Sequence, residues 1–156
     1  MTMFDEAFEK VIGHEGEYID DPKDHGGETK FGVSKRSYPD EDIKGLTLMR
    51  AREIYRRDYW DRCQCDQLPD WIAFHVFDAA VNSGVRQALI WLQRAIGSQP
   101  DGIIGAKTIA CARRADPGTA IARFSGHRLS GIVDMPSWAD HGKGWTRRIA
   151  KNLIDV

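Results

Sequence analysis

Residues 14–18 read HEGEY, and the stretch IDDPKDHGGETKFGV follows at once with carboxylates, turn residues and a threonine. A Glu beside a His first suggests the HExxH zinc site, which needs two His side chains on successive turns of one continuous helix. Here Tyr18 occupies the position of the second His, Gly16 lies between them, and turn-forming residues follow. The sequence therefore does not support a zinc protease.

A calcium-binding loop is also a poor match. In a loop that starts at Asp21, Lys23 and His25 stand at ligand positions, and Gly32 stands where the bidentate Glu belongs. His25 could pair with His14, but nothing nearby completes a three-ligand zinc set. We therefore expect no metal and no cofactor.

Glycoside hydrolysis suits the segment better. It needs a carboxylic acid that stays protonated near neutral pH, together with a group that handles the attacking water. Glu15 follows an amphipathic helix, and the partial negative charge at that helix end favours the protonated acid. Asp24 and Thr29 lie on the hairpin predicted next. We expect Asp24 to orient or deprotonate a water molecule that the Thr29 hydroxyl holds.

Purely structural roles remain open for these side chains. Asp24 also suits an Asx turn, and Thr29 also suits a cross-strand pair. Glu28 is a candidate partner carboxylate, but it faces away if Thr29 faces the substrate, because adjacent strand residues point to opposite sides. Tyr18 is the best candidate for stacking on a sugar, and Asn82 is a candidate for bonding one. A structural role for either is equally open.

The elements that must position these residues are mostly helical. Thr2 and Asp5 form a capping-box pattern before a first helix that Gly13 and Gly16 end, and 29–33 reads as an extended run within a small hairpin. Further helices are expected at 47–61, 70–83, 85–96, 106–115, 119–133 and 144–154, with Asp70 as a cap and with Gly84 and Gly97 as stops.

Composition sets the class of protein. The chain has 156 residues, 42% apolar and 29% charged, with a net charge of −1. This balance is typical of one folded domain and provides no overall field that would attract nucleic acid. The best local patch for a polyanion is the basic stretch, which comprises Lys143, Arg147, Arg148 and Lys151. Cys63, Cys65 and Cys111 do not suggest a disulfide framework.

Several strings together resemble a known family. The order Glu15, Asp24, Thr29 resembles that of the phage-type lysozymes. The string H-E-G-x-Y…D-P-x-D-x-G-G-E-T-K-F-G-V resembles the signature of glycoside hydrolase family 108, a group of N-acetylmuramidases common among phage endolysins. FDAAVNSGVRQALIWLQRAIG and DGIIGAKT resemble that family's C-terminal part, a predicted peptidoglycan-binding region, so the resemblance spans roughly residues 8–110.

The resemblance implies a fold and a catalytic residue. Glu15 matches the catalytic Glu of the family's EGGY motif, whereas Glu17 stands where that motif has Gly. The implied fold is mostly α, a lysozyme-like α+β arrangement in which a helical bundle and a small N-terminal β-hairpin lobe flank a cleft. One muramidase domain would span 1–156, with a catalytic part at about 1–60 and a helical part at about 61–156.

The implied activity is that of an endolysin-type N-acetylmuramidase. It would cleave the β-1,4 bond between N-acetylmuramic acid and N-acetylglucosamine, with peptidoglycan glycan strands as its partner. A lytic transglycosylase and a non-catalytic cell-wall-binding protein remain as alternatives. No signal peptide and no long apolar run are visible, so we expect no integral membrane association. We also expect a monomer. It would be made in the host cytoplasm and act on the wall after release.

Overall fold

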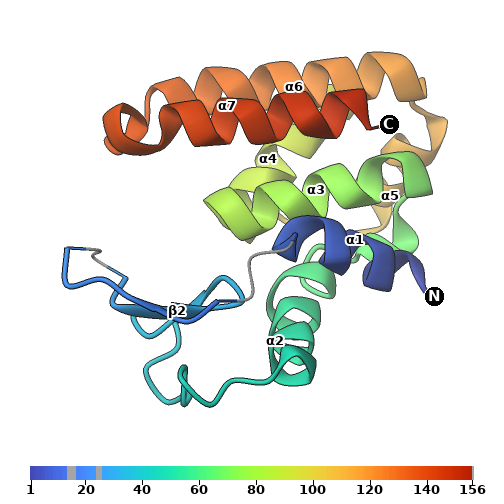
Figure 1. Ribbon diagram of the computed structural model, residues 1–156. Coiled ribbons are helices and arrows are strands. Elements are labelled where there is room, and N and C mark those ends of the chain that lie inside the picture. The colour runs from blue at the N-terminus through green and yellow to red at the C-terminus, as the bar shows by residue number, and fades with distance from the viewer. Residues whose placement is uncertain (14–16, 24–25, 156) are drawn as a thin grey trace. The chain divides into compact units, whose positions relative to one another are not determined.

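The first helix, α1 (Met3–Ile12), begins at the predicted capping box. The Thr2 backbone N–H donates to the Asp5 carboxylate at 2.9 Å, and the Asp5 N–H donates to the Thr2 hydroxyl at 3.2 Å. The helix ends at Gly13, whose φ of 58° suits a glycine. The computed structural model describes residues 1–13, 17–23 and 26–155 (Figure 1).

Three very short strands follow, namely β1 (Ile19–Asp20), β2 (Glu28–Lys30) and β3 (Val33–Ser34). They form one antiparallel sheet in the order β1-β2-β3. The predicted extended run 29–33 is wrong in detail, because the chain reverses at Phe31 and Gly32, with φ values of 50° and 73°. Positive φ at both positions is typical of a type I′ hairpin turn, whose usual sequence is Asn-Gly rather than Phe-Gly.

Helix α2 (Leu48–Tyr55) closes the first of two compact units, Met1–Asp58 and Tyr59–Val156. The Thr47 hydroxyl caps α2 by accepting from the Arg50 N–H, and a π-helical turn, Arg56–Trp60, continues the helix. Apolar side chains from both helices and from the intervening segments are almost fully buried: Phe4, Phe8, Val33, Ile43, Leu46, Ala51, Ile54 and Tyr55. The Phe8 and Tyr55 rings meet edge to face at 5.5 Å.

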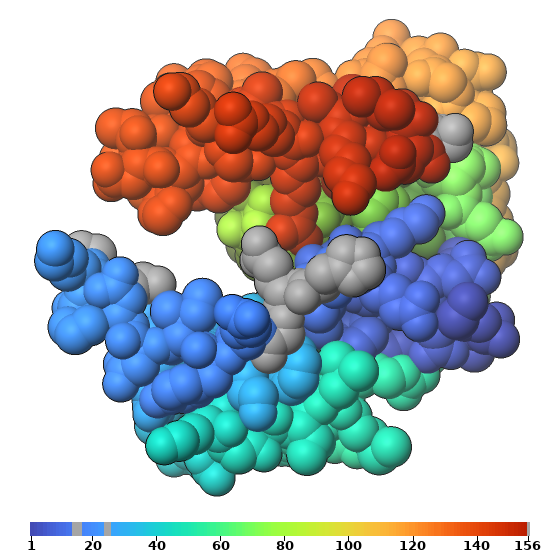
Figure 2. Space-filling view, in the orientation of Figure 1, coloured from blue at the N-terminus to red at the C-terminus, as the bar shows by residue number. Residues whose placement is uncertain are grey.

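The second unit is entirely helical in its regular elements. After a 3₁₀ turn at Cys65–Gln67 come α3 (Asp70–Ser83), α4 (Val85–Ile96), α5 (Ala106–Arg114), α6 (Pro117–Val133) and α7 (Trp138–Ile154). Helix α4 packs against both α3 and α6, and α7 lies along α6. In Figure 2, α6 and α7, coloured orange to red, form one continuous surface of this unit.

Large aromatic side chains fill the centre of the second unit. Trp60 and Trp91 are 0% and 1% exposed, and Trp60 packs edge to face on Phe77 at 5.4 Å. The Trp91 ring lies where a Cβ at Gly131 would be only 2.7 Å from its Cζ2 atom. The absence of a side chain at Gly131 therefore lets α4 and α6 approach closely.

The mostly helical fold with a small N-terminal sheet is confirmed, while some boundaries differ. Helix α7 begins at Trp138 rather than at Gly144, and a Cβ at Gly142 would lie 2.5 Å from the Trp138 ring. The glycine therefore accommodates the Trp138 ring within the helix instead of breaking it. Asp70 is the first residue of α3 rather than its cap. Among the described residues, no helix is long and apolar enough to cross a bilayer.

Candidate functional site

Strand β2 presents Thr29 on one face of the sheet. Thr29 lies directly opposite Ile19 on β1 and Ser34 on β3, so these three side chains share a face. The Thr29 hydroxyl reaches the Gly27 carbonyl only at 3.5 Å, which is long for an O–H···O hydrogen bond. Among the described residues, the hydroxyl is thus only weakly engaged.

Tyr18 and Glu28 lie together on the opposite face. The Tyr18 hydroxyl donates to Glu28 Oε1 at 2.7 Å, and this bond, with partial burial, raises the pKa of Tyr18 to about 12. The phenol therefore stays protonated near neutral pH and holds its ring against the sheet. The structure does not bring the Tyr18 ring beside the Thr29 hydroxyl, and the bond to Glu28 restrains the Tyr18 side chain by its tip.

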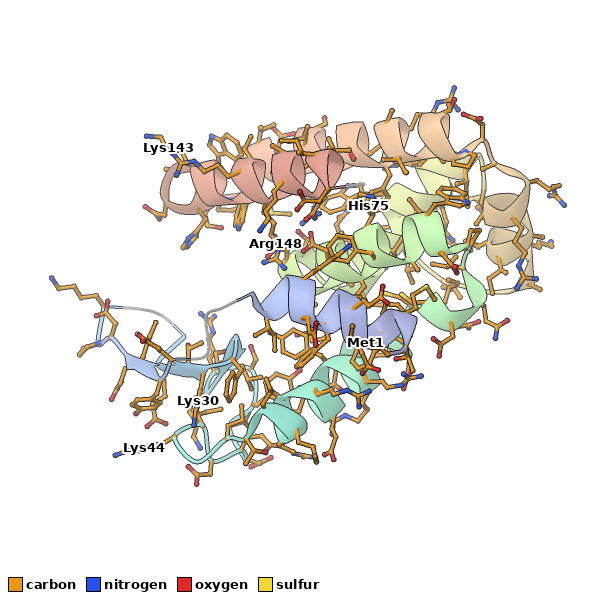
Figure 3. The ribbon with its side chains drawn as sticks, turned by 45° about the vertical axis from the view of Figure 1, so that its right-hand side comes forward. Met1, Lys30, Lys44, His75, Lys143 and Arg148 are labelled. Carbon is orange, nitrogen blue, oxygen red and sulfur yellow. The ribbon has the colours of Figure 1, made fainter. Side chains whose placement is uncertain are left out.

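Helix α2 holds the hairpin turn in place. The Tyr55 hydroxyl donates to the Phe31 carbonyl at 3.1 Å, and a Cβ at Gly32 would lie 2.3 Å from that hydroxyl oxygen. Close to the turn, Lys30 donates from Nζ to the Lys44 carbonyl at 3.1 Å (Figure 3). The strand that carries Thr29 is therefore fixed from one end by contacts to α2 and to the loop before it.

Glu15 and Asp24 lie outside the described residues, so the catalytic roles assigned to them stay predictions. Helix α1 ends at Ile12, so the argument from the helix dipole, which depends on where Glu15 lies, also stays a prediction. Glu17, the departure from the family motif, is exposed.

In the second unit, the structure places Asn82 in the last turn of α3. The side chain is half-buried and makes no hydrogen bond to another described residue. Asp78 lies one helical turn earlier on the same face of α3. The role of Asn82 in substrate binding remains a prediction.

Asp78 is the centre of a buried ionic cluster that the sequence argument missed. Its carboxylate accepts from Arg128 Nη1 at 2.7 Å, from Arg148 Nε at 2.5 Å and from Asn152 Nδ2 at 2.8 Å. The bonds join α3 to α6 and α7, and Figure 3 shows Arg148 extending from α7. One signal was present, because Asp78 is a lone acid within the apolar run WIAFHVFDAAV.

The cluster contains more cationic than anionic groups. Asp78 and Arg128 have side chains that are 2% and 3% exposed, and Arg128 Nε and Nη2 and Arg148 Nη2 are buried without a partner in the described structure. Burial lowers the pKa of Arg128, and the negative charge of Asp78 acts against that shift. Arg148 is therefore ion-paired within the fold, while the predicted polyanion patch that includes it stays a prediction.

The described residues provide no obvious metal site, since no three His, Cys, Asp or Glu side chains converge within that part of the chain. Cys63 and Cys65 are both buried. Burial raises the pKa of the Cys65 thiol, and the Cys65 Sγ approaches the Ala73 carbonyl at 3.7 Å. A protonated, buried thiol is a poor nucleophile and a poor metal ligand.

Comparison with known proteins identifies the family. The family described as glycosyl hydrolase 108 matches residues 8–84. The solved structure of SagA from Brucella abortus is 33% identical, with a TM-score of 0.86, over 96% of this chain and 90% of the SagA chain. The chain belongs to glycosyl hydrolase family 108. No curated protein matches it.

As a family 108 member the protein is a glycoside hydrolase, which removes the support for a non-catalytic wall-binding protein. The matched residues include HEGEY, the whole hairpin and helix α3 up to Gly84. DGIIGAKT lies beyond the residues that match the family. The structural match to SagA, which covers 96% of the chain, extends into this part. The family 108 match therefore contains Glu15, Asp24, Thr29 and Asn82.

Proposed function

We propose that this glycoside hydrolase is an N-acetylmuramidase that cleaves the β-1,4 bond between N-acetylmuramic acid and N-acetylglucosamine in peptidoglycan. The observation that supports this most directly is the family match, which covers both the HEGEY segment and the hairpin. The described residues of the hairpin engage the Thr29 hydroxyl only weakly, as a water-positioning group requires. The substrate is proposed from the family resemblance.

The reaction follows from three roles. Glu15 donates its proton to the glycosidic oxygen while the bond from that oxygen to the anomeric carbon breaks, and positive charge builds on the departing sugar. A water molecule held by Thr29 attacks the anomeric carbon and gives up a proton to Asp24. One water is consumed in each cut, and the new reducing end lies on the muramic acid residue. Tyr18 and Asn82 are assigned to binding the flanking sugars.

The setting in which the enzyme works belongs to the same proposal. A phage-type endolysin acts on the bacterial wall after it is released from the cytoplasm where it was made. We expect the protein to work as a monomer on glycan strands and to need no cofactor.

The test compares Glu15→Gln with the parent in clearing purified peptidoglycan, and mass spectrometry identifies the released sugars. We expect the substitution to reduce the rate by about 10²–10⁴-fold, the usual contribution of a general acid. Glu17→Gln is the matched control, because it removes the same charge two positions away at an exposed side chain.

Three outcomes would change the proposal. Products that end in 1,6-anhydromuramic acid, with no water added, would identify a lytic transglycosylase. If Glu15→Gln retains the parent rate, Glu15 is not the acid, and Glu17 and Glu28 are the next candidates. Thr29→Val keeps the shape of the side chain and removes only the hydroxyl, so an unchanged rate in that variant would exclude Thr29 from water positioning.

A further inference from the structure

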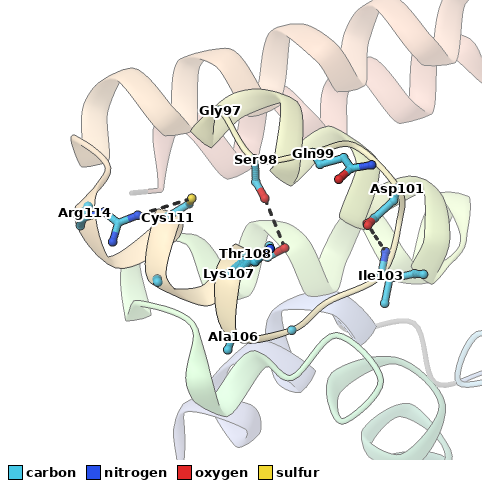
Figure 4. A pocket seen from close by; sticks show the side chains of 12 residues that line it. Gly97, Ser98, Gln99, Asp101, Ile103, Ala106, Lys107, Thr108, Cys111 and Arg114 are labelled. Carbon is cyan, nitrogen blue, oxygen red and sulfur yellow. Dashed lines mark hydrogen bonds between the residues drawn. The ribbon is translucent and has the colours of Figure 1, made fainter.

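The second unit contains a pocket of about 800 Å³ that is lined by the loop after α4 and by one side of α5 (Figure 4). Its lining runs from Gly97 to Arg114, in the part of the chain for which the family resemblance already implies peptidoglycan binding. The side chains that would meet the reacting sugar itself lie instead on the sheet of the first unit. One of them, Ile19, has no role in the reaction proposed above.

Ile19 is the exposed apolar side chain of that sheet. It is 55% exposed, whereas Val33, the other large apolar residue of the three strands, is 1% exposed and belongs to the core. Because adjacent strand residues point to opposite sides, Ser34 faces away from the core that holds Val33. Thr29 lies opposite both Ile19 and Ser34, so the three side chains form one row on this outward face.

The two outer members of the row differ in what they contact within the fold. The Ser34 hydroxyl donates to Ser37 Oγ at 3.1 Å and accepts from the Ser37 N–H at 3.2 Å, so it holds the turn after β3. Ile19 is the most exposed of the three, and its β-branch restricts its rotamers. On the other face, the bond from Tyr18 to Glu28 ties β1 to β2. Ile19 is therefore an apolar contact surface that is already held in place before a ligand binds.

The spacing from Thr29 determines which part of a sugar Ile19 can reach. Side chains directly opposite each other on neighbouring strands have Cβ atoms about 4.5–5.5 Å apart. A water molecule held by the Thr29 hydroxyl lies about 2.8 Å from it, and the anomeric carbon that this water attacks lies about 3–3.5 Å beyond. The acetamido group is attached to the ring carbon next to the anomeric carbon. It therefore falls within the reach of the Ile19 side chain.

We propose that Ile19 covers the acetamido methyl group of the reacting sugar and so favours glycan strands that carry this methyl. The identity of the contacted group rests on the proposed function, in which Thr29 holds the attacking water. An aliphatic side chain forms no hydrogen bond to a sugar hydroxyl, whereas contact with a methyl group removes the apolar surface of both from water. The contact is the same before and during the reaction, so it should act on KM rather than on kcat.

The test compares the parent and Ile19→Ala on soluble glycan strands that carry either N-acetyl or N-formyl groups. The N-formyl group keeps the uncharged amide and removes only the methyl. We expect this change to lower kcat/KM of the parent about 3–10-fold, the usual effect of one methyl group in an apolar contact. Ile19→Ala should raise KM for N-acetyl strands by a similar factor with kcat unchanged. Its own preference for N-acetyl over N-formyl strands should fall to within about twofold, because the partner of the methyl is gone.

Two further variants serve as controls. Leu48→Ala removes an apolar side chain that is 52% exposed in the same unit, and it should keep the parent's preference for N-acetyl strands. Ile19→Thr keeps the β-branch that suits a strand, and it should lose the preference as Ile19→Ala does. Because Ile19 is exposed, both variants at this position should melt within about 2 °C of the parent.

The proposal is wrong if Ile19→Ala keeps the parent's preference for N-acetyl strands, or if the parent has no such preference. It is also wrong if Leu48→Ala loses the preference too, or if Ile19→Ala lowers kcat at an unchanged KM, since Ile19 would then only support the strand that carries Thr29. A parent that cuts the strands without these effects removes the role of Ile19 and leaves the proposed function intact. A parent that cuts neither kind of strand refutes the proposed function itself.

Discussion

Replacing Asp78 with Asn should destabilise the protein more than any substitution at an exposed acid. The change keeps the shape of the side chain but removes the negative charge that pairs with Arg128 and Arg148 among the described residues. Asp78 accepts three hydrogen bonds of 2.5–2.8 Å and its side chain is 2% exposed. Water therefore cannot take the place of the carboxylate in stabilising the two guanidinium groups. Breaking a buried ion pair on one side costs about 3–5 kcal/mol.

The expected loss is large enough to see in a melting curve. For a chain of this length, each 1 kcal/mol lowers Tm by about 2–4 °C. We therefore expect Asp78→Asn to lower Tm by roughly 6–20 °C when unfolding is followed by circular dichroism. The matched control is Asp134→Asn, an exposed acid of the same unit, which should change the free energy of unfolding by no more than about 0.5 kcal/mol.

A second substitution tests why Asp78 matters. Arg148→Met leaves Asp78 with Arg128 and Asn152, and it removes the cation in excess from a side chain that is 30% exposed. We expect it to cost about 1 kcal/mol, well below Asp78→Asn. A loss of less than about 1 kcal/mol in Asp78→Asn, or equal losses in the two variants, would refute the argument from uncompensated buried charge.

Three more predictions concern packing, ionisation and surface charge. Gly131→Ala should be less stable than Gly126→Ala by about 1–3 kcal/mol in urea unfolding, because both gain helix propensity but only the Cβ at 131 meets the Trp91 ring. An absorbance titration should show the Tyr18 phenol ionising near pH 12. Because its pKa is raised in the folded state, the stability that Tyr18 adds is present below about pH 10 and is lost as the pH rises through 12. Lys143→Glu/Arg147→Glu should weaken binding to sacculi at low salt but not at high salt, and equal loss at both would indicate a damaged fold.

Local signals in the sequence predicted much of the fold. The capping box at Thr2 and Asp5 and the helix ends at Gly84 and Gly97 all appear in the structure, because each depends on residues within one or two turns. Phe31–Gly32 did not look like a hairpin turn, since the αL conformation of Phe31 is supported by Tyr55, which lies far along the sequence.

For the candidate site too, the sequence indicates which residues belong together but not how their side chains are arranged. The motif marks Thr29 and Tyr18 on one hairpin, but only the register shows that they occupy opposite faces of the sheet. The partners of Asp78 lie in helices far along the chain, and Arg148 by itself resembles any other surface cation. Local patterns predict where a helix begins, whereas a buried charge pair depends on which helices later meet.

The bond between Tyr55 and the hairpin turn has a consequence for the order of folding. The strands are two or three residues long, and a hairpin of that size has little stability in water without another element to pack against. Its turn accepts support from α2, which follows it in the chain. The hairpin should therefore form after α2 and open with it, so that the amide hydrogens of β2 and β3 exchange with solvent no more slowly than those of α2.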